Sequence, residues 1–419
     1  MCETRFKLAL VIVLGIYMSH TIKASSLGEL YQKALKKSEL VAQQSHVLEG
    51  IQAGVSEAYS VLLPVLNISA QYSRQPAISG FANGIFPESQ TIIKAQVNQP
   101  IFKGFRDFNT LNQRQLTVLE KEFSLKSAKL ELAKQVASAF YTLASVRADL
   151  ALINDIVAIN EVRLGELKKM RKTGRLRSSS IFELESTLAI QKADRSNIQL
   201  QIKLAEKVVT FLTGESPKTL SINSGFPSLP SQNWTALAIK TPSVLSASYE
   251  AHVAKIATDI AIGAYFPSID IAGNYYAVRD VGILKDSHWD ATIIATLPIY
   301  VGGTIEAQIK QAQANQAVKE LGLALAKRKA VDDIQNAILT FTNTVTQWQF
   351  LEVASVAAQA NEAAKYKEFK QGLITLSDVL IAQSARLQTD RTTQKARFSV
   401  WLNRAIVNIT AGLLFKENE

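Results

Sequence analysis

Two segments of the sequence pair a hydroxyl side chain with a carboxylate three residues later. Ser180 is followed by Glu183 and Thr375 by Asp378, and the two pairs stand at a common offset of 195 residues. This is the spacing of a helix capping box, in which the hydroxyl accepts a hydrogen bond from a free backbone N–H and the acid favours the positive helix end. Both segments are therefore predicted to begin helices, and capping alone would explain either acid.

Catalytic chemistry finds no comparable support in the sequence. His46, His252 and His288 are scattered without the spacing of metal ligands. The single cysteine, Cys2, lies in the N-terminal segment, and no glycine-rich phosphate loop is present. We predict no catalytic residue, no metal and no cofactor.

Residues 1–24 have the composition of a secretory signal peptide. Arg5 and Lys7 precede an apolar run of 11 residues, Leu8–Met18, and Ala24 is a small residue suited to cleavage. A membrane-spanning helix needs about 20 apolar residues, so a permanent anchor is not expected. We predict an exported protein. Its formal net charge is +10, and its lysines and arginines are interspersed with nearly as many acidic residues. Neither export nor the aromatic content favours a nucleic-acid partner.

The two hydroxyl–carboxylate pairs follow the ends of very long predicted helices. Residues 104–172 contain no proline, and two step-of-seven apolar rows, one through Leu125 and one through Leu130, predict a rod roughly 100 Å long with two buried seams. Gly174 breaks this rod, and a helix is expected at 180–212. A second rod, 303–371, carries a row through Ile338 and ends at Gly372, and a helix at 375–414 follows.

Each rod is preceded by two segments in which apolar and polar residues alternate, the period of a half-exposed strand. These segments predict β-hairpins at 65–100 and 268–298. Prolines punctuate their ends at Pro64, Pro100, Pro267 and Pro298, and Pro100 and Pro298 stand 198 residues apart, as do Gly174 and Gly372.

The shared spacing predicts an internal duplication. The first structural repeat covers 25–214 and opens with a helix at 27–60, a linker covers 215–243, and the second repeat covers 244–419. The shorter helices of a repeat could lie end to end along its rod.

Each alternating run is about ten residues long, enough for a tilted strand to cross a bilayer, and Tyr72, Tyr275 and Trp289 could serve as interfacial aromatics. Two hairpins of a soluble sandwich fit the same pattern. In a membrane, four strands cannot close on themselves, and an open edge leaves backbone groups unsatisfied. Several subunits would then share one barrel.

Several segments resemble the TolC-like outer-membrane efflux protein family. They are Leu63–Leu66, its echo Phe266–Ile269, the returns Gln99–Pro100 and Leu297–Pro298, and the turn Gly372–Leu380. The resemblance implies a mixed α/β membrane protein, a homotrimer with a 12-stranded β-barrel in the outer membrane of a Gram-negative bacterium and an α-helical barrel in the periplasm. It also implies a periplasmic adaptor and an inner-membrane transporter as partners. The implied function is a passive exit duct for small molecules or secreted polypeptide.

The same resemblance places the two turns at the periplasmic tip. It implies that Asp378, and with it Glu183, line the pore entrance, and that the turns around Gly174, Ser180, Gly372, Leu373 and Thr375 receive the adaptor. Ile381 replaces a second acid of some relatives. Phe369 and Ile374 replace a Tyr and an Arg that lock the entrance in some relatives, so that lock is not carried over.

The first turn departs from the family in its cations, which are Lys168, Lys169, Arg171, Lys172, Arg175 and Arg177. They fit a solvated charge run, or a ring that attracts anions or docks an acidic adaptor surface.

Two other classes of protein remain open from sequence alone. One is a soluble periplasmic coiled-coil adaptor or scaffold, and the other is an exported enzyme with helical arms.

Overall fold

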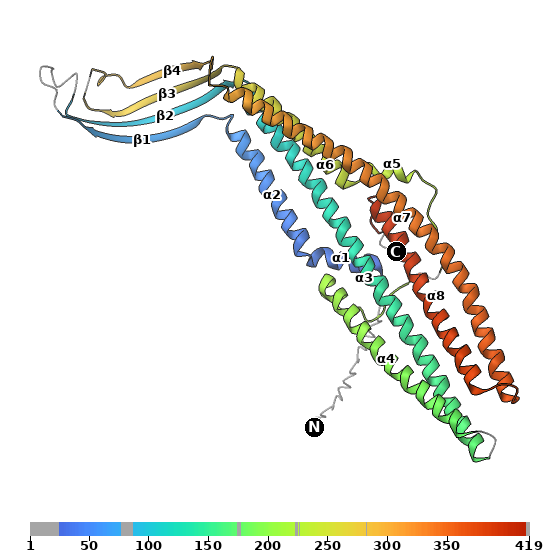
Figure 1. Cartoon of the computed structure of the whole chain (residues 1–419). Helices are drawn as coiled ribbons and strands as arrows, with labels where there is room; N and C mark the ends of the chain where they lie inside the picture. Colours follow the sequence, from blue (N-terminus) through green and yellow to red (C-terminus); the bar gives the residue numbers. More distant parts are fainter. Residues whose placement is uncertain are drawn as a thin grey trace, which may run out of the picture.

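The chain is elongated, with a β-sheet at one end and a bundle of long helices at the other (Figure 1). The computed structural model describes residues 25–76, 87–173, 177–222, 225, 227–281 and 283–415. The predicted signal peptide, Gly174 and Arg175 lie outside these residues.

The four strands form one antiparallel sheet in the order β1-β2-β3-β4. They are β1 (Val65–Arg74), β2 (Ser89–Lys103), β3 (Ser268–Arg279) and β4 (Trp289–Thr296). The central pairing joins β2 to β3, so the two predicted hairpins lie side by side in one sheet. Strands β1 and β4 are its two edges, and each has one neighbour within the described chain.

The two faces of the sheet differ in polarity, as the alternation predicts. Tyr275 lies directly opposite Trp289 on the apolar face, and both side chains are exposed. On the polar face, Asn274 accepts a hydrogen bond from Lys94 and donates one to Asp290. The exposed apolar face of this single-layered sheet favours contact with lipid over contact with water.

Strand β2 continues beyond the proline at which the sequence predicts its end. Pro100 pairs with Asp270, and the strand runs on to Lys103, with a register irregularity between Pro100 and Phe102. Proline lacks the N–H of a ladder bond, and the irregularity accommodates this loss. Pro64 and Pro267 directly precede β1 and β3, whereas Pro298 stands two positions after Thr296, the last residue of β4.

The two long helices are α3 (Arg106–Lys172) and α7 (Thr304–Lys370), each of 67 residues. Two consecutive left-handed residues precede each of them, Gly104–Phe105 and Gly302–Gly303. A Cβ on Gly104 would lie 2.2 Å from the carbonyl oxygen of Gly263, so only glycine fits this contact.

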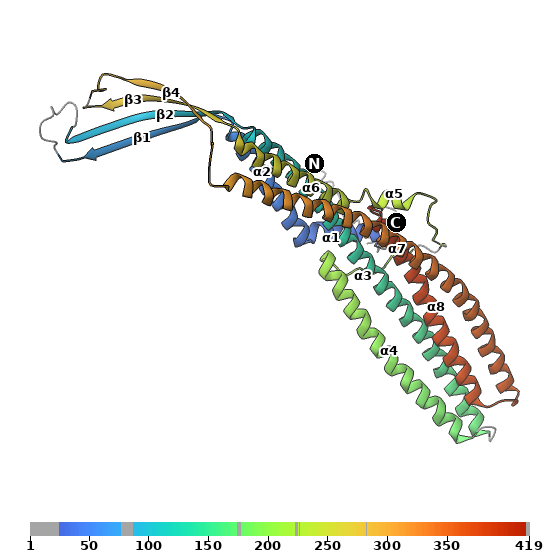
Figure 2. The same ribbon diagram turned by 45° about the horizontal axis from the view of Figure 1, so that its top comes forward.

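The shorter helices lie along the rods (Figures 1 and 2). They are α1 (Leu27–Lys37), α2 (Glu39–Ser60), α4 (Ser178–Thr213), α5 (Trp234–Ala238), α6 (Pro242–Ile262), the short 3-10 turn η1 (Gly263–Tyr265) and α8 (Leu376–Thr410). Helices α2 and α4 flank different halves of α3, as expected for end-to-end placement. The predicted single helix 27–60 is wrong in one respect: Ser38 divides it, because its side chain accepts a hydrogen bond from the N–H of Val41 and caps α2.

Both predicted rows of α3 contribute to the core. Leu132 and Ile153 of one row and Ala137 and Ala144 of the other are buried. On α7 the predicted row is half-buried at Val331, Ile338 and Val345 and exposed at Ala317 and Ala324. The buried row of α7 is a different step of seven, Ile334, Phe341 and Trp348, which packs against α5 and α8.

Candidate functional site

The ends of both long helices meet at the pole of the molecule opposite the sheet (Figure 1). There the α3–α4 and α7–α8 turns share a small apolar core, whose buried members are Leu167, Ile181, Leu184, Phe369, Leu376, Val379 and Leu380. This core fixes the two turns next to each other. We call this region the tip.

Thr375 and Asp378 form the capping box that the sequence predicts. The Thr375 hydroxyl accepts from the N–H of Asp378 at 3.4 Å, and the Asp378 carboxylate accepts from the N–H of Thr375 at 3.0 Å. The hydroxyl of Thr375 also donates to this carboxylate at 2.6 Å. These hydrogen bonds from Thr375 hold the pKa of Asp378 below its ordinary value, so the exposed carboxylate is charged at neutral pH.

The capping box predicted at Ser180 and Glu183 is not formed. Helix α4 begins two residues earlier, at Ser178, and Arg177 is its N-cap residue. The three consecutive serines offer alternative starting points, and the helix uses the earliest. Ser180 therefore lies within the first turn, and Glu183 is half-buried one turn further along.

The other predicted tip residues differ in exposure. Phe369 is buried and Ile374 packs partly buried beside it. Leu373 and Ile381 are exposed, at 69% and 67%. Gly372 has a φ of +78° and open space around it, so its left-handed conformation, and no steric contact, accounts for glycine in this turn.

A groove of about 420 Å³ runs between α4 and α8 beside the tip. Glu183 and Ile190 line it from α4, and Ser377 and Ile381 line it from α8. The structure therefore brings Glu183 and Ile381 to one groove, although they belong to different repeats.

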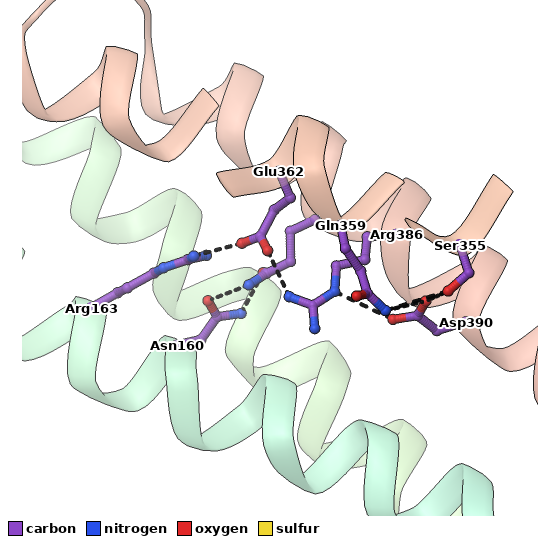
Figure 3. A network of polar contacts seen from close by, with 8 residues as sticks. Asn160, Arg163, Ser355, Gln359, Glu362, Arg386 and Asp390 are labelled. Carbon is purple, nitrogen blue, oxygen red and sulfur yellow. Dashed lines mark hydrogen bonds and ion pairs between the residues drawn. The ribbon is translucent and has the colours of Figure 1, made fainter. Parts of the chain in front are cut away.

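A buried ionic network lies further up the rods and joins three helices (Figure 3). Glu362 of α7 pairs with Arg163 of α3 at 2.5 Å and with Arg386 of α8 at 2.7 Å. Arg386 also pairs with Asp390 at 3.3 Å, and Asp390 accepts a hydrogen bond from Ser355 of α7. Burial opposes ionisation of Glu362, but the hydrogen bonds from both arginines outweigh it and hold the pKa of this carboxyl below its ordinary value.

Further polar contacts surround this network. Buried Asn160 and Gln383 exchange two hydrogen bonds between α3 and α8. The hydroxyl of Tyr366 donates to Glu166 at 2.7 Å, and the guanidinium of Arg163 lies 4.3 Å from the centre of the Tyr366 ring. The contacts of Tyr366 therefore join α7 to α3.

A second arginine of α8 reaches the outer helices. Arg391 pairs with Asp149 of α3 at 2.7 Å and with Asp194 of α4 at 2.6 Å.

Neither the Glu362 network nor the set of Arg391 pairs was predicted from the sequence. The spacing held one usable signal, because Arg163 and Glu362 stand 199 residues apart with opposite charge, close to the repeat offset of 198.

The fold defines a class of protein: an elongated subunit with a four-stranded sheet at one pole and two 67-residue helices that run to the other. The family model described as outer membrane efflux protein matches residues 30–215 and 236–404. The chain belongs to the outer membrane efflux protein family.

Relatives and solved structures agree with this assignment. The outer membrane protein TolC of Escherichia coli (strain K12) is 21% identical over 444 residues, which cover 98% of this chain and 88% of that protein. The outer membrane efflux protein BepC of Brucella suis is 23% identical over 312 residues, which cover 69% of this chain and 65% of that protein. The outer membrane protein VceC of Vibrio cholerae superposes with a TM-score of 0.80 at 18% identity, covering 93% of this chain and 97% of that chain.

Membership places the protein in the outer membrane, with its helices in the periplasm. Its function is that of an outer-membrane exit duct of a tripartite efflux system.

Proposed function

We propose that three copies of the chain close one duct, a 12-stranded β-barrel continued by an α-helical barrel. The observation that carries this proposal is the pair of open edges, β1 and β4, on a sheet whose apolar face is exposed. Unpaired backbone groups at such an edge cannot remain in lipid, and a barrel removes both edges. Three four-stranded sheets supply 12 strands.

The helices support the same arrangement. Exposed apolar side chains form a stripe on α4, through Ile190, Leu200, Leu204, Val208 and Phe211. Another stripe on α7 comprises Val318, Leu321, Leu325, Leu339, Phe350, Val353 and Val356. Large exposed apolar side chains that recur along one helix are typical of a protein–protein interface, and neighbouring copies would cover them.

The duct then works with two partners, a periplasmic adaptor and an inner-membrane transporter that supplies the energy. It is passive and catalyses no reaction. It carries small molecules or secreted polypeptide outward, and Asp378 and Glu183 contribute negative charge near its periplasmic entrance. The turns around Gly174, Ser180, Gly372, Leu373 and Thr375 are the adaptor-docking turns.

Cysteine crosslinking between edge strands tests the closure. Cys2 is replaced by Ser, Ile68 of β1 becomes Cys, and Ala291, Ile293 and Ala295 of β4 become Cys one at a time. Because paired strands have a single register, one of the three double variants should oxidise to a covalent trimer in isolated outer membranes. Each single-cysteine variant is the control.

Two results would reject the proposal. Crosslinked ladders that extend beyond three chains would show a different number of subunits. A soluble periplasmic monomer without crosslinks would favour the rival scaffold function. Discrete conductance of the purified protein in planar bilayers provides the functional measurement.

A further inference from the structure

The polar face of the sheet carries a connected cluster of side chains from three strands. Asn274 of β3 donates a hydrogen bond to Asp290 of β4 at 2.8 Å and accepts one from Lys94 of β2 at 3.2 Å. The hydroxyl of Tyr276 also hydrogen-bonds to Asp290, and the guanidinium of Arg279 lies 4.3 Å from the centre of the Tyr276 ring. All five side chains are half-buried, so their mutual contacts fix them on the sheet. We call these five residues the strand cluster.

A β-bulge brings Arg279 into the strand cluster. Because side chains alternate between the two faces of a strand, Arg279 would otherwise lie on the face opposite to Tyr276, three residues earlier. Ala277 is an extra residue of β3 between the partners of Lys94 and Ile93 on β2. The bulge turns the side chain of Arg279 back to the polar face, where it contacts the Tyr276 ring. A bulge that redirects a side chain in this way is typical of a functional position.

The charges of the strand cluster are unbalanced. The carboxylate of Asp290 is engaged by two neutral groups, the Asn274 amide and the Tyr276 hydroxyl. Within the described part of the chain, neither Lys94 nor Arg279 forms an ion pair with a carboxylate, and their printed partners are an amide oxygen and an aromatic ring. Two cations therefore stand beside one acid, and each copy of the chain presents an excess of positive charge on this face.

We propose that the strand clusters of the copies form a positively charged collar around the lumen of the barrel, where they bind anionic groups of passing molecules. This inference rests on the proposed function, because closure of the barrel turns the apolar face to lipid and the polar face to the lumen. Carboxylate and phosphate groups are the ligands that fit, since the planar guanidinium of Arg279 matches their oxygens.

The position of the collar sets it apart from the acidic tip. Asp290 is the second residue of β4, directly after the β3–β4 connection at the end of the sheet that lies away from the helices. Asp378 stands at the opposite pole of the molecule. The duct would therefore present negative charge where cargo enters and positive charge near the point where cargo leaves.

Reversal potentials in planar bilayers test the collar. In a KCl gradient, Arg279→Gln should lower the ratio of chloride to potassium permeability by about twofold or more, because a positive charge leaves the wall of the lumen. Lys94→Gln should shift the ratio in the same direction. Both shifts should shrink as the salt is raised from about 0.1 M to about 1 M, because the Debye length falls from about 10 Å to about 3 Å.

The matched control is Arg74→Gln, the same substitution at the end of β1. Arg74 follows Tyr72 by two residues in a regular register, so it lies on the apolar face, and it pairs with Glu88 at 3.0 Å. Its loss should leave the permeability ratio close to that of the wild type. Arg279→Lys retains the charge and should also keep the wild-type ratio, whereas a purely structural role of Arg279 would not follow the charge.

Chemical labelling places the side chain in the lumen. With Cys2 replaced by Ser, Arg279→Cys should react with water-soluble methanethiosulfonates, which form a mixed disulfide with the thiol and release methanesulfinate. A reagent that adds an ammonium group should restore the permeability ratio toward the wild type. A reagent that adds a sulfonate group should lower it further.

The remaining outcomes separate the two proposals. Wild-type ratios in both Lys94→Gln and Arg279→Gln would overturn the collar, as would an equal shift in Arg74→Gln. A conducting Arg279→Cys pore that no water-soluble reagent modifies would place this side chain outside the lumen and also overturn it. A wild-type protein that forms no conducting pore would instead reject the proposed function.

Discussion

Glu362 is the residue through which α3, α7 and α8 are joined above the tip. Its carboxylate serves two arginines in a buried setting, so Glu362→Ala would leave Arg163 and Arg386 without their main partner. Removing one member of a buried ionic cluster costs about 3–5 kcal/mol. We expect a matching loss of amide protection in the lower half of α7, measured by hydrogen exchange. Glu352→Ala, at an exposed position of the same helix, should change protection little; equal losses in the two variants would contradict this role.

The lowered pKa of Glu362 predicts how this region responds to acid. A depressed folded-state pKa means that the pairs stabilise the fold fully above the ordinary glutamate pKa of about 4.3, and lose that contribution as pH falls through the folded value. The thermal midpoint of the wild type should therefore fall more steeply below about pH 4 than that of Glu362→Gln, which cannot titrate. Parallel midpoint–pH curves for the two proteins would disprove the assignment.

Asp378 combines a structural role with a proposed electrostatic one. Asp378→Asn retains an oxygen that can accept from the N–H of Thr375, so folding should survive, whereas Asp378→Ala loses the cap. If the Asp378 charge also lines the entrance, the pore of the Asn variant should prefer cations less than the wild-type pore does. It should also be blocked less by cations in planar bilayers. If the Asn variant matches the wild type in both measurements while Ala loses only stability, Asp378 acts as a cap alone.

At the scale of the element, one set of α7 residues makes contacts within the chain, and another set is proposed to make contacts between chains. Ile334 is fully buried, whereas Leu339 is 67% exposed on the same helix. Leu339→Asp should leave the helical content of the chain intact and prevent the trimer, because the charge would be buried only on assembly. Ile334→Asp should unfold the chain itself. Circular dichroism and native mass in detergent distinguish the two, and a normal trimer from Leu339→Asp would exclude this stripe from the interface.

Periodicity was sufficient to predict most elements, since strand alternation and proline-free rods are local properties. It was insufficient where several local choices compete. The three serines before Ile181 could each begin a helix, and the helix begins at the earliest of them, a choice that the local pattern does not decide. On α7, the row through Ile338 and the row through Phe341 share one period, and the larger aromatic side chains of the second occupy the core.

The ionic network was only weakly indicated by the sequence, for a different reason. Arg163 and Glu362 are one charged pair among many, and only the placement of α8 between the two rods brings them into contact in a buried setting. By contrast, the turn at Gly372 and its capping box are local, and the sequence was enough to predict them.

At the scale of the whole molecule, the sheet and the tip stand at opposite poles, which predicts their orientation in the cell. An epitope inserted at Leu284, in the β3–β4 connection, should be reachable by antibody on intact cells. The same epitope at Gly372 should be reached only after the outer membrane is permeabilised. Labelling of Gly372 on intact cells would reverse this orientation.

The two open edges of the sheet also have a genetic consequence. A chain damaged only along β4 keeps β1 intact, so it can still pair with a healthy copy, yet it leaves that barrel unclosed. When healthy and damaged chains are made in equal amounts and mix freely in the proposed ring of three, only about one ring in eight contains no damaged copy. The proposed trimer therefore predicts that lesions on an edge strand are dominant, whereas lesions that destroy the fold before assembly are recessive.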